Sequence, residues 1–161
     1  MLHSRTRPEE YLFLRKAIGY MHNYPGLIHH PAEELIFTCL RQSVPDCAAL
    51  CMQLTEQHNE FNILETTLFG YIDHAQRGEM ACRELLKKLT NTYCMDQFEH
   101  ITLEEDEILP KAVACLTPDD WRNIGCQSNL QLDPLGDPDI LKHYDSLYDY
   151  ITAIDINLQS H

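Results

Sequence analysis

The stretch YCMDQFEHITLEEDEILPKAVACL, residues 93–116, carries the pattern that decides the fold. Its apolar residues recur every three or four positions, which is the spacing of one face of an α-helix. The same face contains His100 and Glu104, which are one helical turn apart. Burying a carboxylate is expensive unless a cation or strong hydrogen-bond donors compensate it. The pattern therefore predicts a core helix whose inward carboxylate contacts a bound metal ion.

Two further segments repeat this arrangement. His29 and Glu33 are also four residues apart, on a stripe that continues through Ile36 and Leu40. His58 occupies one position of an otherwise apolar helical stripe. That stripe consists of Cys47, Leu50, Cys51, Leu54, Phe61, Leu64 and Leu68. One His-x3-Glu pair is weak evidence, because exposed pairs are common, but two pairs in phase with His58 predict a metal site inside a helical bundle.

The remaining sequence predicts an all-α chain. Turn residues separate long segments with helical periodicity, and no run of alternating β-branched residues indicates a strand. We expect helices over residues 8–23, 29–41, 46–75 and 79–116, a short helix holding Trp121, a loop over 127–138 and an amphipathic helix over 139–158. Asp46 is a candidate helix cap, the Tyr24-Pro25-Gly26 step a break, and Pro110 an interruption. Residues 1–126 are expected to form the metal-binding bundle, with residues 127–161 packed on the same domain.

Composition excludes several classes of function. The chain has 161 residues and a formal net charge of −13, which disfavours binding to nucleic acid or to an acidic membrane surface. It contains no apolar run long enough for a membrane span and no secretory signal, so we expect a soluble, cytoplasmic protein. Seven cysteines without a C-x-x-C pair fit reduced thiols. Zinc-protease, nucleophile-elbow and phosphate-loop motifs are absent, so the sequence indicates metal binding and leaves enzymatic activity open.

These motifs together resemble the hemerythrin-like, HHE cation-binding family. The similar segments are YPGLIHHPAEELIF (24–37), EQH (56–58), HITLEEDEILP (100–110), DW (120–121) and DPLG (133–136). The resemblance implies an up-down four-helix bundle with a non-haem centre, usually of two iron ions, and zinc, nickel or manganese are the alternatives. By motif position, His29, His58 and His100 would be terminal ligands, and Glu33 and Glu104 would bridge the metals. Oxygen carriers, oxygen or nitric oxide sensors, iron sensors and iron-centre repair proteins belong to this family.

The chain departs from the family pattern in two places. Family members usually have an earlier helix with an inward histidine, yet only 28 residues precede His29 here. We expect that helix to be absent: either the start is truncated, or His3, His22 or His143 substitutes, or a second subunit completes the site. A missing helix would leave an apolar groove, which favours a homodimer. The oxygen carriers also have a His-x3-His step where this chain has Asn62, which weakens the prediction of a full oxygen-binding site.

The register of the first motif has two readings. Pro31 is well placed as a first helical residue, which would put His29 just outside the helix and favour His30 with Glu34. We favour His29 with Glu33, because their stripe is apolar further along whereas that of the rival pair reaches Arg41. The alternative to an iron protein that binds oxygen or nitric oxide is a structural or interaction bundle with a degenerate or mononuclear zinc or nickel site.

Overall fold

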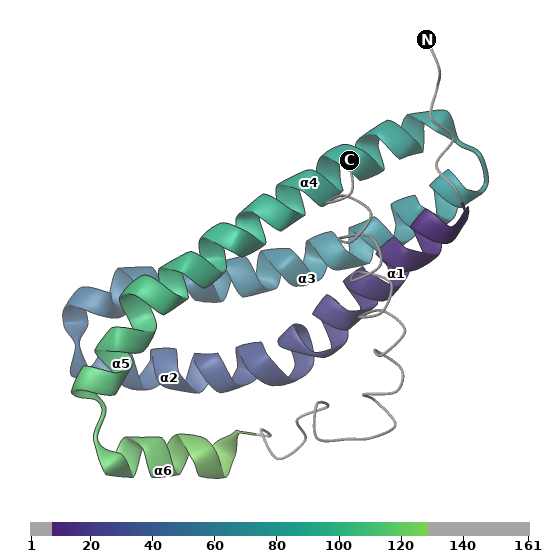
Figure 1. Ribbon diagram of the computed structural model, residues 1–161. Helices are drawn as coiled ribbons and strands as arrows, with labels where there is room; N and C mark the ends of the chain where they lie inside the picture. The colour runs from purple at the N-terminus through teal and green to yellow at the C-terminus, as the bar shows by residue number, and fades with distance from the viewer. Residues whose placement is uncertain (1–7, 129–161) are drawn as a thin grey trace, which may run out of the picture.

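The computed structural model describes residues 8–128, and all the regular elements in this range are helical (Figure 1). Three long antiparallel rods run up, down and up, and a short helix follows them. This arrangement confirms the all-α bundle predicted from the sequence. The loop and helix expected over residues 129–158 lie outside the described range.

The predicted break lies within the first rod, which bends there. It consists of α1 (Pro8–Asn23), the π turn η1 (Pro25–His29) and α2 (His30–Ser43). The backbone N–H of His29 donates to the Tyr24 carbonyl at 3.3 Å, which is the wide hydrogen bond of a π turn. The break expected at Tyr24-Pro25-Gly26 is confirmed in that α1 ends at Asn23, but the π turn keeps the chain helical, and α2 continues at an angle to α1 (Figure 1).

The third rod contains a second π turn. It consists of α4 (Met80–Leu103), η3 (Glu104–Ile108) and α5 (Leu109–Cys115). A proline inside a regular α-helix meets the carbonyl four residues earlier and donates no hydrogen bond. Each π turn ends two residues before a proline, Pro31 or Pro110, so the wider turn accommodates both rings without ending the rod. The turns also hold His29 and Glu104, and π turns often occur at functional sites.

The second rod is the single long helix α3 (Ala48–Gln76). The 3-10 turn η2 (Pro45–Cys47) precedes it, so Cys47 occupies the N-cap position and no side chain caps the helix. The expected cap at Asp46 is therefore wrong. The predicted end at Gln76 is confirmed, and Gly78 turns the chain towards α4 with a φ of 94°.

The short helix α6 (Pro118–Gln127) confirms the predicted Trp121 helix. Its capping box has two reciprocal bonds: the Asp120 N–H donates to Thr117 Oγ1 at 3.2 Å, and the Thr117 N–H donates to Asp120 Oδ2 at 2.8 Å. The helix packs against α2 at the end of the bundle where α2 and α5 terminate (Figure 1).

Two apolar clusters fill the bundle, one towards each end. The first consists of Phe37, Leu40, Cys47, Cys51, Leu54, Ile108, Ala112, Leu116 and Ile124. The second consists of Tyr11, Ile18, Phe61, Leu68, Ile72, Ala75, Leu86 and Tyr93. Along all three rods, the residues between these clusters include the buried histidines and glutamates of the candidate site. The site therefore lies in a polar layer between two apolar layers. Within residues 8–128, no helix has the length and apolar character that crossing a bilayer requires.

Candidate metal centre

The structure brings all five sequence-predicted residues together, from all three rods. His29 Nε2 lies 2.9 Å from Glu33 Oε1, and His100 Nε2 lies 3.2 Å from Glu104 Oε1. His58 Nε2 lies 3.0 Å from His100 Nε2 and 3.7 Å from both Glu33 Oε2 and Glu104 Oε1. Three imidazoles and two carboxylates thus converge on one small space.

Two carboxylate oxygens in this space have no hydrogen-bond partner. Both Glu33 Oε2 and Glu104 Oε1 are buried, and neither accepts a hydrogen bond of good geometry in the described structure; only the Nε2 atoms of His58 and, for Glu104, of His100 lie 3.2–3.7 Å away. A buried carboxylate oxygen without a partner is costly, because it has lost its hydration without replacement. A bound cation would satisfy both oxygens, and imidazole with carboxylate is a ligand set for iron, zinc and manganese. The residues present therefore fit a metal centre.

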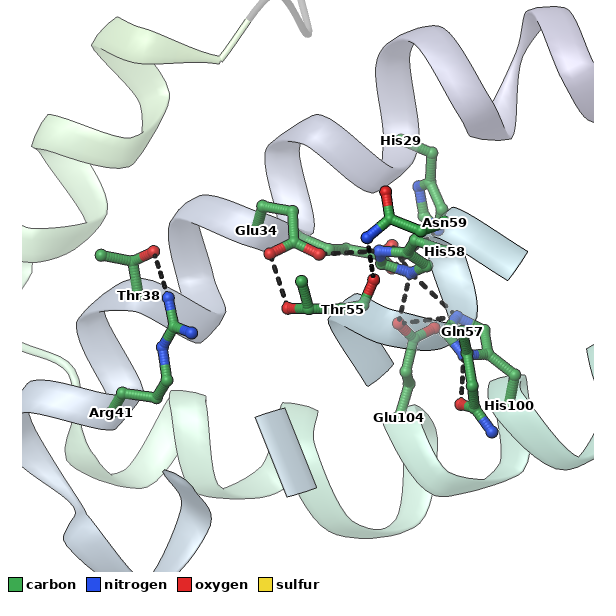
Figure 2. A network of polar contacts seen from close by, with 11 residues as sticks. His29, Glu34, Thr38, Arg41, Thr55, Gln57, His58, Asn59, His100 and Glu104 are labelled. Atoms are coloured by element: carbon green, nitrogen blue, oxygen red, sulfur yellow. Dashed lines mark hydrogen bonds and ion pairs between the residues drawn. The ribbon is translucent and has the colours of Figure 1, made fainter. Parts of the chain in front are cut away.

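Hydrogen bonds behind two of the imidazoles set which nitrogen faces the centre. His58 Nδ1 lies 2.9 Å from Glu34 Oε1, and His100 Nδ1 lies 3.0 Å from Gln57 Oε1 (Figure 2). These oxygens only accept, so each Nδ1 carries the donated hydrogen, and each Nε2 is directed towards the space between the rods. The Thr55 hydroxyl donates to Glu34 Oε2 at 2.7 Å and holds that carboxylate in place. Such contacts orient metal-binding histidines.

The rival pair from the sequence, His30 and Glu34, lies directly beside the five residues. The His30 ring stacks on His58 with centroids 3.9 Å apart and planes 6° apart, and it meets His100 edge-on. Burial, reinforced by the neighbouring His58 and His100, lowers the pKa of His30 to about 3. His30 is thus a buried, neutral imidazole that stacks on His58, and Glu34 contacts the opposite nitrogen of His58.

Comparison with known families agrees with this geometry. The family model of the hemerythrin HHE cation binding domain matches residues 2–112. The chain belongs to this family. The match includes residues of all three rods, ending within α5, and every residue of the converging set. No curated protein and no solved structure matched the chain.

His29, one of the three histidines predicted to bind metal in the HHE domain, is less buried than expected. The His29 side chain is 50% exposed, whereas the His58 and His100 side chains are almost fully enclosed. His29 lies in the π turn η1, which places it at the edge of the polar layer rather than inside it. A hydrogen bond to Glu33 raises the pKa of His29 despite partial burial. The site therefore has a solvent-facing side at His29.

Neighbouring buried side chains of the HHE domain shift one another's pKa values. Burial alone would raise the pKa of Glu104, but contacts with His100 and His58 outweigh it and lower the pKa to about 2. For His58, burial lowers the pKa, but Glu104 and Glu34 together raise it above its usual value. The carboxylates thus attract a positive charge to the centre. A proton on His58 can supply it, and so can a metal ion.

A cavity of about 530 Å³ opens beside the centre, between the first rod and α3. It is lined by Gly26, His30, Pro31, Glu34, Thr55, His58, Asn59, Asn62 and Glu65. Asn62, which stands where oxygen carriers of the family have a histidine, is in this wall. The cavity offers a small molecule a polar path to the His58 side of the centre.

A second polar cluster lies one heptad further along the bundle. Glu65 is only 2% exposed and accepts a hydrogen bond from the Tyr93 hydroxyl at 2.7 Å. His22 Nδ1 lies 3.1 Å from its other oxygen. Phe61 packs against the rings of both Tyr93 and His100, so it separates the two polar clusters. Sequence reasoning missed Glu65, and it considered His22 as a residue that could complete the metal site, whereas the structure pairs His22 with Glu65.

Proposed function

We propose that this HHE domain binds two iron ions. His29, His58 and His100 would be terminal ligands, and Glu33 and Glu104 would bridge the ions. The observation that supports this best is the pair of buried carboxylate oxygens without partners, one on each of two rods, both 3.7 Å from His58 Nε2. A carboxylate that bridges two ions uses both of its oxygens, which would complete the bonding of these side chains.

Iron(II) in such a ligand set, with an open position, binds diatomic molecules such as oxygen and nitric oxide. The chain contributes the orientation of His58 through Glu34 and of His100 through Gln57. The exposed His29 side and the cavity beside His58 would admit a small ligand. Because Asn62 replaces the additional histidine of the oxygen carriers, we favour sensing, iron storage or iron-centre repair over reversible oxygen transport.

Metal analysis combined with absorption spectroscopy tests the proposal. We expect protein reconstituted anaerobically with iron(II) to retain close to two irons per chain after desalting. Air exposure should then produce the charge-transfer absorption of bridged ferric ions. Retention of no transition metal, with a thermal midpoint that iron does not change, would instead support a structural or interaction bundle.

A mononuclear zinc or nickel site is the second candidate. His30, His58 and His100 each offer a nitrogen, and these nitrogens lie within 4.8 Å of one another. The parallel stacking of His30 on His58 favours packing over convergent ligation. A His30→Phe variant discriminates the two sites, because it preserves the stack and removes the third nitrogen. A mononuclear site would lose its metal in this variant, whereas the di-iron site would retain both ions.

We also propose that the protein is cytoplasmic, where a reducing environment would keep its cysteines free. We further propose that the domain forms a homodimer through α4 and α5. The support is a set of large apolar side chains that are exposed on these helices: Met95, Phe98, Ile101 and Val113. Light scattering should give twice the chain mass, and Phe98→Glu should give the monomer mass. A monomeric native protein would exclude this interface.

A further inference from the structure

A second group of metal-binding side chains lies at the turn between α3 and α4. His74 is in the last turn of α3, Glu79 immediately precedes α4, and Cys82 is in the first turn of α4. The turn is at the end of the bundle where α1 begins (Figure 1). His74 is sixteen positions after His58 on the continuous helix α3, which corresponds to about 24 Å at 1.5 Å per residue. The group is therefore separate from the candidate iron centre.

The three side chains already converge. His74 Nδ1 lies 3.0 Å from Glu79 Oε1, and Cys82 Sγ lies 3.5 Å from Glu79 Oε2. One ligand atom from each residue lies within 4.8 Å of the other two. Ligand atoms around a tetrahedral zinc ion are about 3.5 Å apart, given bonds of about 2.0–2.3 Å. Small side-chain rotations would bring these atoms to that spacing.

The backbone of the turn holds the group in place. Gly78, with its positive φ, reverses the chain direction between the two helices. The Glu79 N–H donates to the His74 carbonyl at 3.4 Å, and the Cys82 N–H donates to the Glu79 carbonyl at 3.1 Å. Binding an ion would therefore require little ordering of the main chain.

We propose that His74, Glu79 and Cys82 form a second, independent site for a borderline divalent transition-metal ion, with zinc as the best match. One imidazole, one carboxylate and one thiolate provide three of four tetrahedral positions, and water would supply the fourth. The ion would displace the Cys82 thiol proton to solvent and link the end of α3 to the start of α4. The thiolate makes this site chemically different from the iron centre, whose predicted ligands are all nitrogen and oxygen.

Cobalt(II) is the probe, because a cobalt–thiolate bond gives a near-ultraviolet charge-transfer band that nitrogen and oxygen ligands do not. Reduced, metal-stripped full-length protein is titrated with cobalt(II) under anaerobic conditions. We expect the band to reach the intensity of one cobalt–thiolate site per chain, whether or not cobalt also occupies the candidate iron centre, and to be bleached by zinc. Cys82→Ser should abolish it, and His74→Ala should weaken cobalt binding by about tenfold or more.

Two matched variants separate this site from other sites in the chain. Cys94→Ser removes an exposed cysteine of the same helix and should leave the band unchanged. Glu104→Gln alters the candidate iron centre and should also leave it unchanged, so failure of the iron proposal does not affect this test. A wild-type protein without a thiolate band would overturn the inference, and so would a band that persists in Cys82→Ser.

Discussion

His58 donates from Nδ1 to Glu34 Oε1 across 2.9 Å, and this contact directs the opposite ring nitrogen, Nε2, towards Glu33 and Glu104. Glu34, which follows the predicted ligand Glu33, thus has a different role. Glu33 faces the shared space between the rods, whereas Glu34 faces α3 and holds an imidazole in position. Adjacent residues of one helix point about 100° apart, which is how the sequence Glu33-Glu34 serves both roles.

Glu34→Gln tests this positioning role. The amide preserves the shape of the side chain but weakens the hydrogen bond that fixes the His58 tautomer. We expect iron affinity to fall by about 10- to 100-fold, as is usual when an orienting partner of a metal-bound histidine is lost. Competition with a chelator of known affinity measures the change. Glu60→Gln, on an exposed position of α3, is the control, and equal affinities of the two variants would contradict the role of Glu34.

Glu104 is predicted to be essential for metal retention. Glu104→Ala removes one of the two unpartnered carboxylate oxygens and a ligand that would bridge the ions. We expect iron content after desalting to fall to one ion per chain or fewer. Glu105→Ala, at the exposed neighbouring position, should retain the wild-type content. Iron content that is unaffected by Glu104→Ala would refute the assignment of this residue.

The helices and the inward faces could be predicted from the sequence, because each buried stripe repeats over many turns. His58 illustrates this, since the residues one turn away on either side, Leu54 and Phe61, are both buried. The two π turns could not be predicted in the same way. An extra residue in a turn changes neither composition nor average periodicity, yet it moves His29 to the solvent edge and carries the chain past a proline.

Glu65 shows the second limit of prediction from the sequence. A single glutamate in a long helix usually faces solvent, and nothing nearby in the sequence identifies its partners. Those partners come from other rods: Tyr93 from α4 and His22 from α1. Glu65 lies seven residues after His58 and Tyr93 lies seven before His100, so the heptad spacing was visible in the sequence. This spacing identifies Tyr93 as a partner of Glu65 only once the packing of the rods is known.

The lowered pKa of His30 implies that the stability of the metal-free protein depends on pH. Its pKa is about 3 in the folded state against about 6.5 when unfolded, so the unfolded chain binds a proton more readily. This group therefore contributes a stability that is fully present above pH 6.5 and is lost as the pH falls from there towards 3. The raised pKa of His58 acts in the opposite direction, since its contribution declines as the pH rises through the folded value.

His30→Leu isolates this contribution. Urea unfolding in the presence of a chelator, at about pH 7.5 and about pH 5, gives the free energy of unfolding for both proteins. We expect the wild type to lose more stability than His30→Leu between the two conditions, because leucine cannot be protonated in the unfolded chain. An equal loss in both proteins would show that His30 does not control the acid sensitivity.

Two glycines near the α3–α4 turn should respond to alanine with opposite signs. Gly70 lies inside α3, and a Cβ there meets no atom within 4 Å, so Gly70→Ala should stabilise the fold by about 0.5–1 kcal/mol. Gly78 also has space around it, but its φ of 94° is strained for any residue with a side chain. Gly78→Ala should therefore destabilise the fold by about 1–2 kcal/mol. Thermal unfolding of both variants alongside the wild type gives the two signs directly, and destabilisation of equal size at both positions would mean that the turn geometry at Gly78 is not the cause.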